Sequence, residues 1–387
     1  MDRKVIKELM AVLYDKPLDK NSKTLLVDRR KELARLENIT SFQPLGIYGV
    51  CGETGVGKTT VLNLLNDTIK SFYIILSEKD SKEIIIGDLL YKLALISAQA
   101  VNRGDKNKVE KIIEWIITER TETSSMHGGI NSVVSAGATK ASSVSRKFNV
   151  YQAYQMLGEL IDILKNKFER IVLIIDELDK EKKSDVLQIL DSLKHLLVQN
   201  GVISIISLPF SIYREYAQDR LRWNESGNLE NIFKDMIFLE PLKLADVQEM
   251  LVKRLKNYPD ILTNDAYQEI VRFSDGNPRD ALWITQQIIL DNTEARKIDG
   301  SIATNSIKKI VKEYMKFGRA LTDIQKKILM KIALNPGDRS SIANSLENEV
   351  KPQTTYTYIN RLIKEGFLLE RNGIISVPGK IYFSLLD

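Results

Sequence analysis

The chain has 387 residues, of which 43% are hydrophobic and 28% charged, a composition typical of folded globular proteins with two or three domains. Lys and Arg number 56 against 51 Asp and Glu, so the net charge of +5 gives little general support for nucleic-acid binding. The single cysteine, Cys51, excludes an intrachain disulfide and a cysteine-rich zinc site, and only two histidines are present, which disfavours chemistry based on several imidazoles.

Strands and helices are predicted to alternate in the first part of the chain. Short apolar strands are expected at 46–50, 72–76, 171–175, 202–208 and 235–239, with helices between them at 59–69, 88–100, 109–119, 151–165 and 184–199. This alternation predicts an α/β fold with a three-layer parallel sheet over residues 1–241. The segment from about 121 to 150 is rich in Ser, Gly and Ala, and we interpret it as an insertion, either plain surface or a ribbon that contacts DNA.

After Pro241 the pattern becomes helical. Periodicity at 244–256, 264–273, 279–291 and 304–317 predicts a helical lid over residues 242–318. In residues 319–387, helices are expected at 323–334, 339–346 and 352–365, and two apolar segments flank the turn Asn372-Gly373. Three helices followed by a hairpin predict a winged-helix domain.

A complete phosphate-binding motif, G-x-x-x-x-G-K-T, lies between the first strand and the next helix. Backbone N–H groups of such a loop surround phosphate oxygens, the Lys58 charge lies near the β- and γ-phosphates, and the Thr59 hydroxyl is a ligand for Mg²⁺. We therefore predict that ATP or ADP binds to Gly52, Glu53, Thr54, Gly55, Val56, Gly57, Lys58, Thr59 and Thr60.

An acidic pair, Asp176-Glu177, ends the strongly apolar strand at 171–175. The carboxyl end of a central parallel strand faces the ligand crevice of such sheets. Asp176 is predicted to hold Mg²⁺, and Glu177 to orient and activate the attacking water. Asp179 and Lys180, which follow, are interpreted as solvent-exposed.

These motifs together resemble those of AAA+ ATPases, and more narrowly the archaeal and eukaryotic origin-recognition and replication-initiator ATPases. The resemblance extends over roughly residues 20–387. Residues 27–33 are similar to a segment that lies near the adenine in that branch, which implies that Arg29 binds the cofactor. Ser207 occupies the position of sensor 1. Residues 276–282 are similar to the sensor 2 segment, which implies that Arg279 contacts the γ-phosphate.

The resemblance also implies an arginine that acts on the nucleotide of a neighbouring copy. Arg214, Arg220 and Arg222 are candidates, and we favour Arg222 because it belongs to the densest cluster. Self-association is therefore expected.

The third helix of the winged-helix domain is expected to enter the major groove of double-stranded DNA. Between 321 and 387, nine basic residues stand against seven acidic ones, a weak electrostatic footprint, and winged helices can also dock proteins. The predicted DNA contacts are Thr354, Thr355, Tyr356, Tyr358, Arg361 and, near the wing, Arg371.

The sequence thus predicts a slow, Mg²⁺-dependent AAA+ ATPase that couples its nucleotide state to assembly and DNA binding, as a DNA replication initiator or a mobile-element regulator. The alternative is a signalling or defence switch ATPase whose winged helix is a nucleotide-controlled clamp or a docking module for a protein partner. Apolar runs are no longer than a strand and a signal-like segment is absent, so we expect a cytoplasmic protein without a membrane partner.

Overall fold

The computed structural model describes residues 1–76, 81–127, 149–197, 202–221, 228–315, 321–371 and 373–386. The chain forms two compact units. The α/β unit comprises Pro17–Lys23 and Arg29–Glu240, and the helical unit comprises Met1–Lys16, Thr24–Asp28 and Pro241–Asp387. Within these described ranges, no helix is both long and apolar enough to span a membrane.

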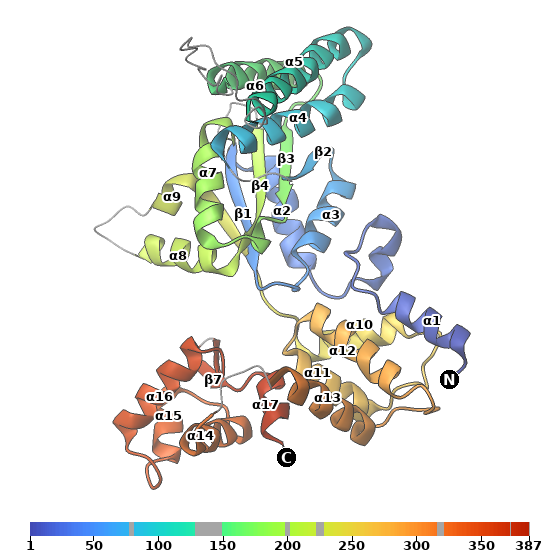
Figure 1. Ribbon diagram of the computed structural model, residues 1–387, viewed down its shortest axis with the longest axis vertical. Coiled ribbons are helices and arrows are strands. Elements are labelled where there is room, and N and C mark those ends of the chain that lie inside the picture. The colour runs from blue at the N-terminus through green and yellow to red at the C-terminus, as the bar shows by residue number, and fades with distance from the viewer. Residues whose placement is uncertain are drawn as a thin grey trace, which may run out of the picture. The chain divides into compact units, whose positions relative to one another are not determined.

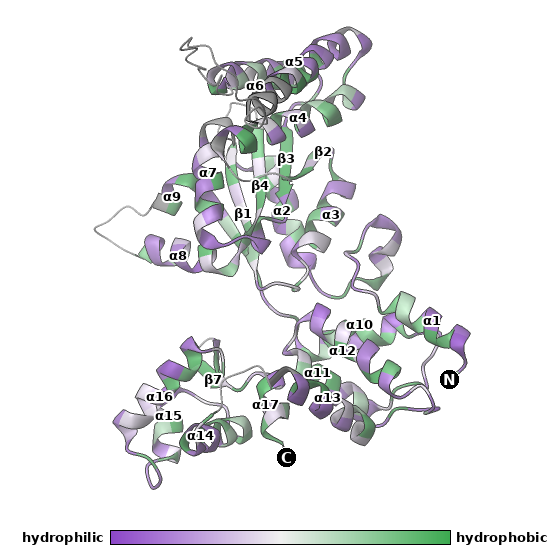
Figure 2. Ribbon diagram, viewed as in Figure 1, coloured by the Kyte–Doolittle hydropathy of each residue, from purple (hydrophilic) through white to green (hydrophobic). Residues whose placement is uncertain are grey.

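The α/β unit contains a five-stranded sheet with the strand order β2-β3-β4-β1-β5 (Figure 1). Its strands are β1 (Gly46–Gly52), β2 (Ser71–Ile75), β3 (Ile171–Asp176), β4 (Val202–Pro209) and β5 (Phe233–Leu239). All neighbouring strands are parallel. Every residue of β3 is buried, which explains the continuous run of apolar residues there, and Figure 2 shows the hydrophobic colouring of β3 and β4. The predicted three-layer α/β fold is confirmed.

Helices cover both faces of this sheet (Figure 1). They are α2 (Arg30–Phe42), α3 (Lys58–Thr68), α4 (Lys82–Ala100), α5 (Arg103–His127), α6 (Val150–Lys165), α7 (Lys183–Leu197), α8 (Phe210–Leu221) and α9 (Asn228–Ile232). Val172 and Ile174 of β3 pack with α2 and α3, whereas Leu173 and Ile175 belong to the core on the opposite face, with α4 to α8. The alternation along β3 therefore assigns each of its residues to one of two cores.

Helix α5 is longer than the sequence predicts. We expected a helix at 109–119, but α5 begins at Arg103 and continues to His127, into the segment interpreted as an insertion. Residues 128–148 lie outside the described part of the chain, so the interpretation of that segment as surface or ribbon stays a prediction.

The helical unit contains the lid helices and the winged helix. Its elements are α1 (Arg3–Val12), α10 (Leu244–Arg254), α11 (Asn264–Ser274), α12 (Pro278–Asp291), α13 (Gly300–Met315), α14 (Asp323–Leu334), α15 (Arg339–Ser345), α16 (Pro352–Lys364), β6 (Leu369–Arg371), β7 (Ile374–Ser376) and α17 (Gly379–Leu385). Helices α14, α15 and α16 precede the antiparallel β6–β7 hairpin, which is the expected winged-helix order, and they enclose a core of their own with Ile328, Ile359 and Ile375.

Helix α1 belongs to the helical unit, although we expected residues 1–16 in the α/β unit. Leu9 and Leu13 are fully buried in the same cluster as Ile288 of α12. These leucines lie four positions apart and form an apolar stripe that is buried against the lid. Residues 1–16 precede the first strand in the chain, but they pack with the helical unit.

Helix α17 follows the wing and returns the chain to the lid. Phe383 is fully buried in the lid core, and its ring centroid lies 6.4 Å from that of Phe273. A Cβ at Gly379 would lie 1.9 Å from the carbonyl oxygen of Arg272, so the two backbones are in close contact. The Gly379 N–H donates to Asp275 Oδ2 at 2.6 Å. The winged-helix domain is therefore attached to the lid through a helix that the sequence analysis did not predict.

Candidate nucleotide-binding site

The loop between β1 and α3 has the backbone conformation of a phosphate cradle. Gly55 and Gly57 have φ angles of 88° and 101°, which favour glycine. At Gly52 a Cβ would lie 2.7 Å from the Leu239 carbonyl oxygen. The first turn of α3, which begins at Lys58, has no side-chain cap, so its N–H groups are available to an anion. Within the loop Glu53 and Gly55 are half-buried, Thr54 is exposed and Val56 is buried.

Lys58 is only 4% exposed, and its ammonium group has several close oxygen neighbours. It donates to the carbonyl oxygens of Gly52 at 2.9 Å and Glu53 at 2.8 Å. It also forms an ion pair with Asp179 Oδ2 at 3.0 Å. A buried cation requires such partners to offset its desolvation.

Asp179 was expected at the solvent-exposed surface, and the structure corrects that interpretation. Its side chain is 11% exposed because it pairs with Lys58, and its Oδ1 accepts a hydrogen bond from Ser207 Oγ at 3.3 Å. The short helical turn Leu178–Lys180 is anchored by Leu178, which is fully buried. Asp179 therefore connects the end of β3, the predicted sensor residue on β4 and the phosphate-loop lysine.

Asp176 is the last residue of β3 and is fully buried. Its Oδ1 accepts the Glu177 N–H at 2.7 Å, and its Oδ2 accepts the Tyr73 hydroxyl at 2.5 Å. Sequence reasoning missed Tyr73. Burial is the main cause that raises the pKa of Tyr73 far above its ordinary value, followed by the negative charge of Asp176, so this hydroxyl stays protonated and acts as a donor.

Glu177 lies at the exposed edge of the same group. Its backbone is left-handed, with φ 69°, and its carboxylate pairs with Lys180 at 2.6 Å while its side chain remains 34% exposed. Lys180 is exposed, as expected. The acidic pair therefore divides into one buried and one accessible carboxylate.

Two predicted cofactor contacts have identified structural partners. Arg29 is 4% exposed, and its Nη2 donates to the carbonyl oxygens of Val56 at 3.0 Å and Glu240 at 2.7 Å. The Thr60 hydroxyl accepts the Leu18 N–H at 3.2 Å, whereas Thr59 is half-buried in the first turn of α3. Arg29 thus supports the loop backbone, and its predicted contact with the nucleotide stays a prediction.

Cys51 precedes the loop and is fully buried. Burial raises the pKa of its thiol to about 12, although the charge of Lys58 acts in the opposite direction. The thiol is therefore protonated at neutral pH and is not a nucleophile here.

The structure gives each described arginine of the prediction other partners within its own unit. Arg279 belongs to the helical unit, where it pairs with Asp15 at 2.5 Å, so its reach to a γ-phosphate stays a prediction. Arg222 lies outside the described residues. Arg220 donates to the Tyr216 hydroxyl at 2.9 Å, and the Arg214 guanidinium lies 5.1 Å from the centre of the Phe210 ring.

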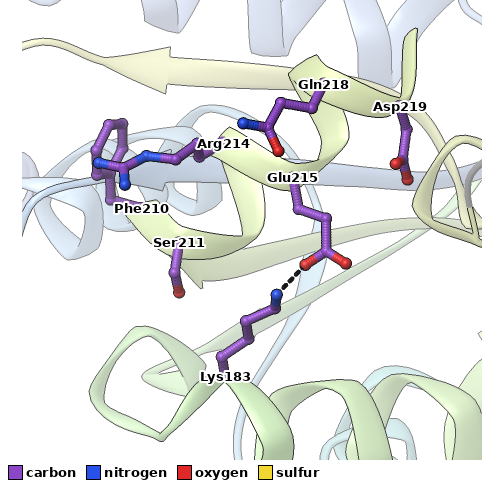
Figure 3. Close-up of a pocket in the computed structure, with 7 residues that line it drawn as sticks. All are labelled: Lys183, Phe210, Ser211, Arg214, Glu215, Gln218 and Asp219. Carbon is purple, nitrogen blue, oxygen red and sulfur yellow. Dashed lines mark ion pairs between the residues drawn. The ribbon is translucent and has the colours of Figure 1, made fainter. Parts of the chain in front are cut away.

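Arg214 also borders a cavity of about 430 Å³ beside α8 (Figure 3). In Figure 3 the Lys183 side chain points toward Glu215 of α8, with which it forms an ion pair. Two basic and two acidic side chains line this cavity, so their charges balance and do not favour a polyphosphate. Its lining consists of Lys183, Phe210, Ser211, Arg214, Glu215, Gln218 and Asp219.

On α16, some predicted DNA contacts reach the surface. Thr354 and Tyr356 are exposed and Tyr358 is half-buried. Arg361 is exposed as well, but its Nε lies 3.0 Å from the carboxylate of Glu365 on the next turn.

Thr355 does not belong to that exposed face, and its assignment is corrected, whereas the DNA contact predicted for Arg371 near the wing stays a prediction. Thr355 is fully buried because it lies on the same stripe of α16 as Ile359 and Leu362. The Arg371 guanidinium is turned inward, where it donates to the Asp275 carbonyl oxygen at 3.3 Å.

Comparisons with known proteins agree with this fold. A family model described as an ATPase domain predominantly from Archaea matches residues 26–282. A Walker-type ATPase of Pyrococcus abyssi covers 97% of this chain over 99% of its own length, with a TM-score of 0.53 and 15% identity, which shows a shared fold.

Two further solved structures cover most of the chain at lower similarity. The ORC2 protein of Aeropyrum pernix, in ADPNP and ADP complexes, covers 96% of this chain and 95% of its own, with a TM-score of 0.45 and 13% identity. The RuvB Holliday junction branch migration motor of Thermotoga maritima covers 96% and 97%, with a TM-score of 0.41 and 16% identity. No curated protein matches the sequence.

Proposed function

The chain belongs to the family of ATPase domains found predominantly in Archaea, and on that premise we propose that it binds ATP with Mg²⁺ and hydrolyses it slowly. One observation carries this proposal: a glycine cradle at the start of α3 adjoins a buried lysine that is paired with a carboxylate from the β3 turn. A family of ATPase domains implies nucleotide binding. The identity of the site residues and the use of Mg²⁺ are our proposals.

The loop residues fit a triphosphate. The uncapped first turn of α3 and the left-handed glycines Gly55 and Gly57 offer backbone N–H groups to phosphate oxygens. Lys58 would exchange its carbonyl and Asp179 contacts for phosphate oxygens. Because these contacts already hold the ammonium at the loop, the lysine is positioned before any nucleotide binds.

The oxygen donors beside the loop also fit Mg²⁺, which prefers carboxylate and hydroxyl ligands. Thr59 and Asp176 would hold the ion, directly or through water. A carboxylate has about four acceptor positions, and the two hydrogen bonds to Asp176 leave acceptor capacity. When bound, Mg²⁺ would neutralise developing charge on the phosphates.

Glu177 is proposed as the base that accepts a proton from the attacking water. Its carboxylate is partly exposed and pairs with Lys180 at 2.6 Å, so it remains accessible to a water molecule beside the loop. Glu177→Gln should keep ATP affinity and reduce phosphate release by about 100-fold or more. Glu169→Gln, at an exposed position preceding β3, is the matched control. Unchanged turnover in Glu177→Gln would remove Glu177 from this role.

We propose that copies of the chain assemble so that Arg222 of one copy contacts the nucleotide of its neighbour. Arg279 would contact the nucleotide bound to its own chain. Mixing tests this directly, because a Lys58→Ala subunit keeps the arginine and an Arg222→Ala subunit keeps the nucleotide site. The mixture should hydrolyse ATP faster than either variant alone. A rate equal to the average of the two separate rates rejects a trans role for Arg222.

Duplex DNA is the proposed ligand of the winged helix. Thr354, Tyr356 and Lys364 are exposed on α16 and are compatible with base-edge and phosphate contacts. Lys364→Glu in the full chain should weaken duplex binding and lower the salt slope by about 1. Lys326→Glu, an exposed change on α14, should leave both unchanged. Fluorescence anisotropy across salt, with ATP and with ADP, gives both quantities.

The alternative, a switch ATPase with a protein-docking winged helix, has one observation in its favour. Arg339 forms two contacts with the Glu370 carboxylate, at 3.0 and 2.7 Å, and Arg361 pairs with Glu365. These pairs neutralise cations that a DNA-binding face would use. If the wild-type chain shows no salt-dependent duplex binding in either nucleotide state, the DNA proposal fails and this alternative is favoured.

A further inference from the structure

Tyr73 is a side chain of the nucleotide site that the proposed chemistry has not yet used. It lies on β2, which pairs with β3 in a register that places Tyr73 opposite Ile174 and Ile75 opposite Asp176. Its ring packs with the core on the α2–α3 face of the sheet. Residues 172, 174 and 176 of β3 share one face of the sheet by alternation. The Tyr73 hydroxyl therefore extends along β3 to the carboxylate at its end.

The Asp176 carboxylate depends on this hydroxyl for one of its two identified hydrogen bonds. Asp176 is fully buried, and an ionised carboxylate in that setting requires donors. The Glu177 N–H donates to Asp176 Oδ1 at 2.7 Å, and the Tyr73 hydroxyl donates to Asp176 Oδ2 at 2.5 Å. The backbone donor is fixed by the chain, whereas the tyrosine donor is supplied by a different strand.

We propose that Tyr73 is a positioning residue for Mg²⁺: its hydroxyl holds the Asp176 carboxylate in one orientation for an ion bound together with ATP. The inference rests on the proposed function, because it concerns the metal of the same site. Outer partners of metal ligands fix the orientation of those ligands and contribute to metal affinity. A tyrosine hydroxyl is protonated at neutral pH, so it can donate this hydrogen bond to the carboxylate.

A purely structural role for Tyr73 predicts a different result. If the side chain only filled space and stabilised the strand, its hydroxyl would affect nucleotide binding equally with and without Mg²⁺. A positioning role affects only the part of the affinity that depends on the metal. Mg²⁺-dependent and Mg²⁺-independent binding therefore separate the two roles.

The test compares wild-type protein with Tyr73→Phe, which keeps the ring and removes the hydroxyl. The dissociation constant of a fluorescent ATP analogue is measured in EDTA and then across a Mg²⁺ titration. In EDTA the two proteins should bind alike, and the Mg²⁺ concentration that gives half of the gain in affinity should rise about 10-fold or more in Tyr73→Phe. Tyr48→Phe is the matched control, because the Tyr48 hydroxyl donates to the Pro44 carbonyl at 2.7 Å, and it should behave as wild type.

A second comparison shows whether the effect passes through Asp176. In an Asp176→Asn background, Tyr73→Phe should cause no further change in the Mg²⁺ dependence. An equal loss with and without Mg²⁺, an unchanged Mg²⁺ titration, or a full effect in the Asp176→Asn background would each overturn the inference. If wild-type protein shows no Mg²⁺-dependent ATP binding, the proposed function itself fails, which is a distinct outcome.

Discussion

Replacing Asp275 with asparagine should stabilise the helical unit at neutral pH and reduce its pH dependence. Asp275 follows α11 in a left-handed conformation, with φ 50°, which asparagine also tolerates. Its Oδ2 accepts the Gly379 N–H, a bond that an amide oxygen can replace. Burial is the main cause that raises the pKa of Asp275 from 3.8 to about 6, despite the opposing effects of the Gly379 N–H, Arg371 and Lys380, while Asp280 adds to the rise.

The magnitude follows from linkage. A shift from 3.8 to about 6 corresponds to about 3 kcal/mol at 1.36 kcal/mol per unit. The native state binds the proton more tightly than the unfolded chain, so the free energy of unfolding falls as the pH rises through this window. Above the native pKa the full cost of the buried charge is present. This shift already includes the attraction of the carboxylate to Arg371 and Lys380, so we expect asparagine to gain about 3 kcal/mol at about pH 7.5 and little at about pH 4.

Urea denaturation followed by tryptophan fluorescence measures this gain in the helical unit alone. The chain has three tryptophans, and Trp283 packs against the lid core. Trp115→Phe and Trp223→Phe therefore leave a single reporter of that unit. The reasoning is refuted if Asp275→Asn changes the free energy of unfolding equally at both pH values, or if its benefit is larger in acid.

Three further tests concern other contacts. Gly379→Ala should destabilise the helical unit in thermal denaturation, because its Cβ would lie 1.9 Å from a backbone carbonyl oxygen. The control Gly158→Ala in α6, whose Cβ would have nothing within 4 Å, should stabilise the protein by about 0.5–1 kcal/mol. Equal effects of the two substitutions would contradict this reasoning. Lys58→Ala should lower the free energy of unfolding by about 3–5 kcal/mol, because the Asp179 carboxylate stays buried without its cation. Adding Asp179→Ala in the same chain should recover part of that loss in urea denaturation. If the effects of the two substitutions simply add, the two residues are not coupled. Arg29→Ala should weaken ATP binding about 10-fold. The Val56 carbonyl oxygen in the loop and the Glu240 carbonyl oxygen after β5 would lose their donor, and each unpaired group costs about 1–3 kcal/mol. Unchanged affinity by calorimetry would argue against loop support.

The sheet and the phosphate loop were predictable because their signals are local. Buried parallel strands such as β3 are continuous apolar runs, and the loop motif is contiguous in sequence. Thr355 was avoidable as an error, because the helical period already places it on the stripe of Ile359 and Leu362. The position of Thr355 on the buried face of α16 is a better guide to its exposure than the polarity of its side chain.

The contacts of Tyr73 and Asp179 could not be predicted in the same way. Tyr73 reaches Asp176 only because β2 pairs with β3 in one register, and sequence alone does not give that register. Asp179 had a usable signal, its spacing three residues after Asp176 in D-E-L-D, but the turn that aims it at Lys58 depends on the buried Leu178. Contacts supplied by tertiary neighbours were therefore missed, whereas the residues within motifs could be proposed from the sequence.

The shared core of α1 and α17 has a consequence for how a ribosome delivers this protein. Leu9 and Phe383 belong to one buried cluster, so α1 enters a core that is complete only after α17, which follows the α/β unit in the chain, has been made. The α/β unit ends at Glu240, and domains generally fold as units while the nascent chain grows. The nucleotide-binding unit can therefore fold on the ribosome, whereas the lid acquires its complete core only once Phe383 has been translated and released from the exit tunnel.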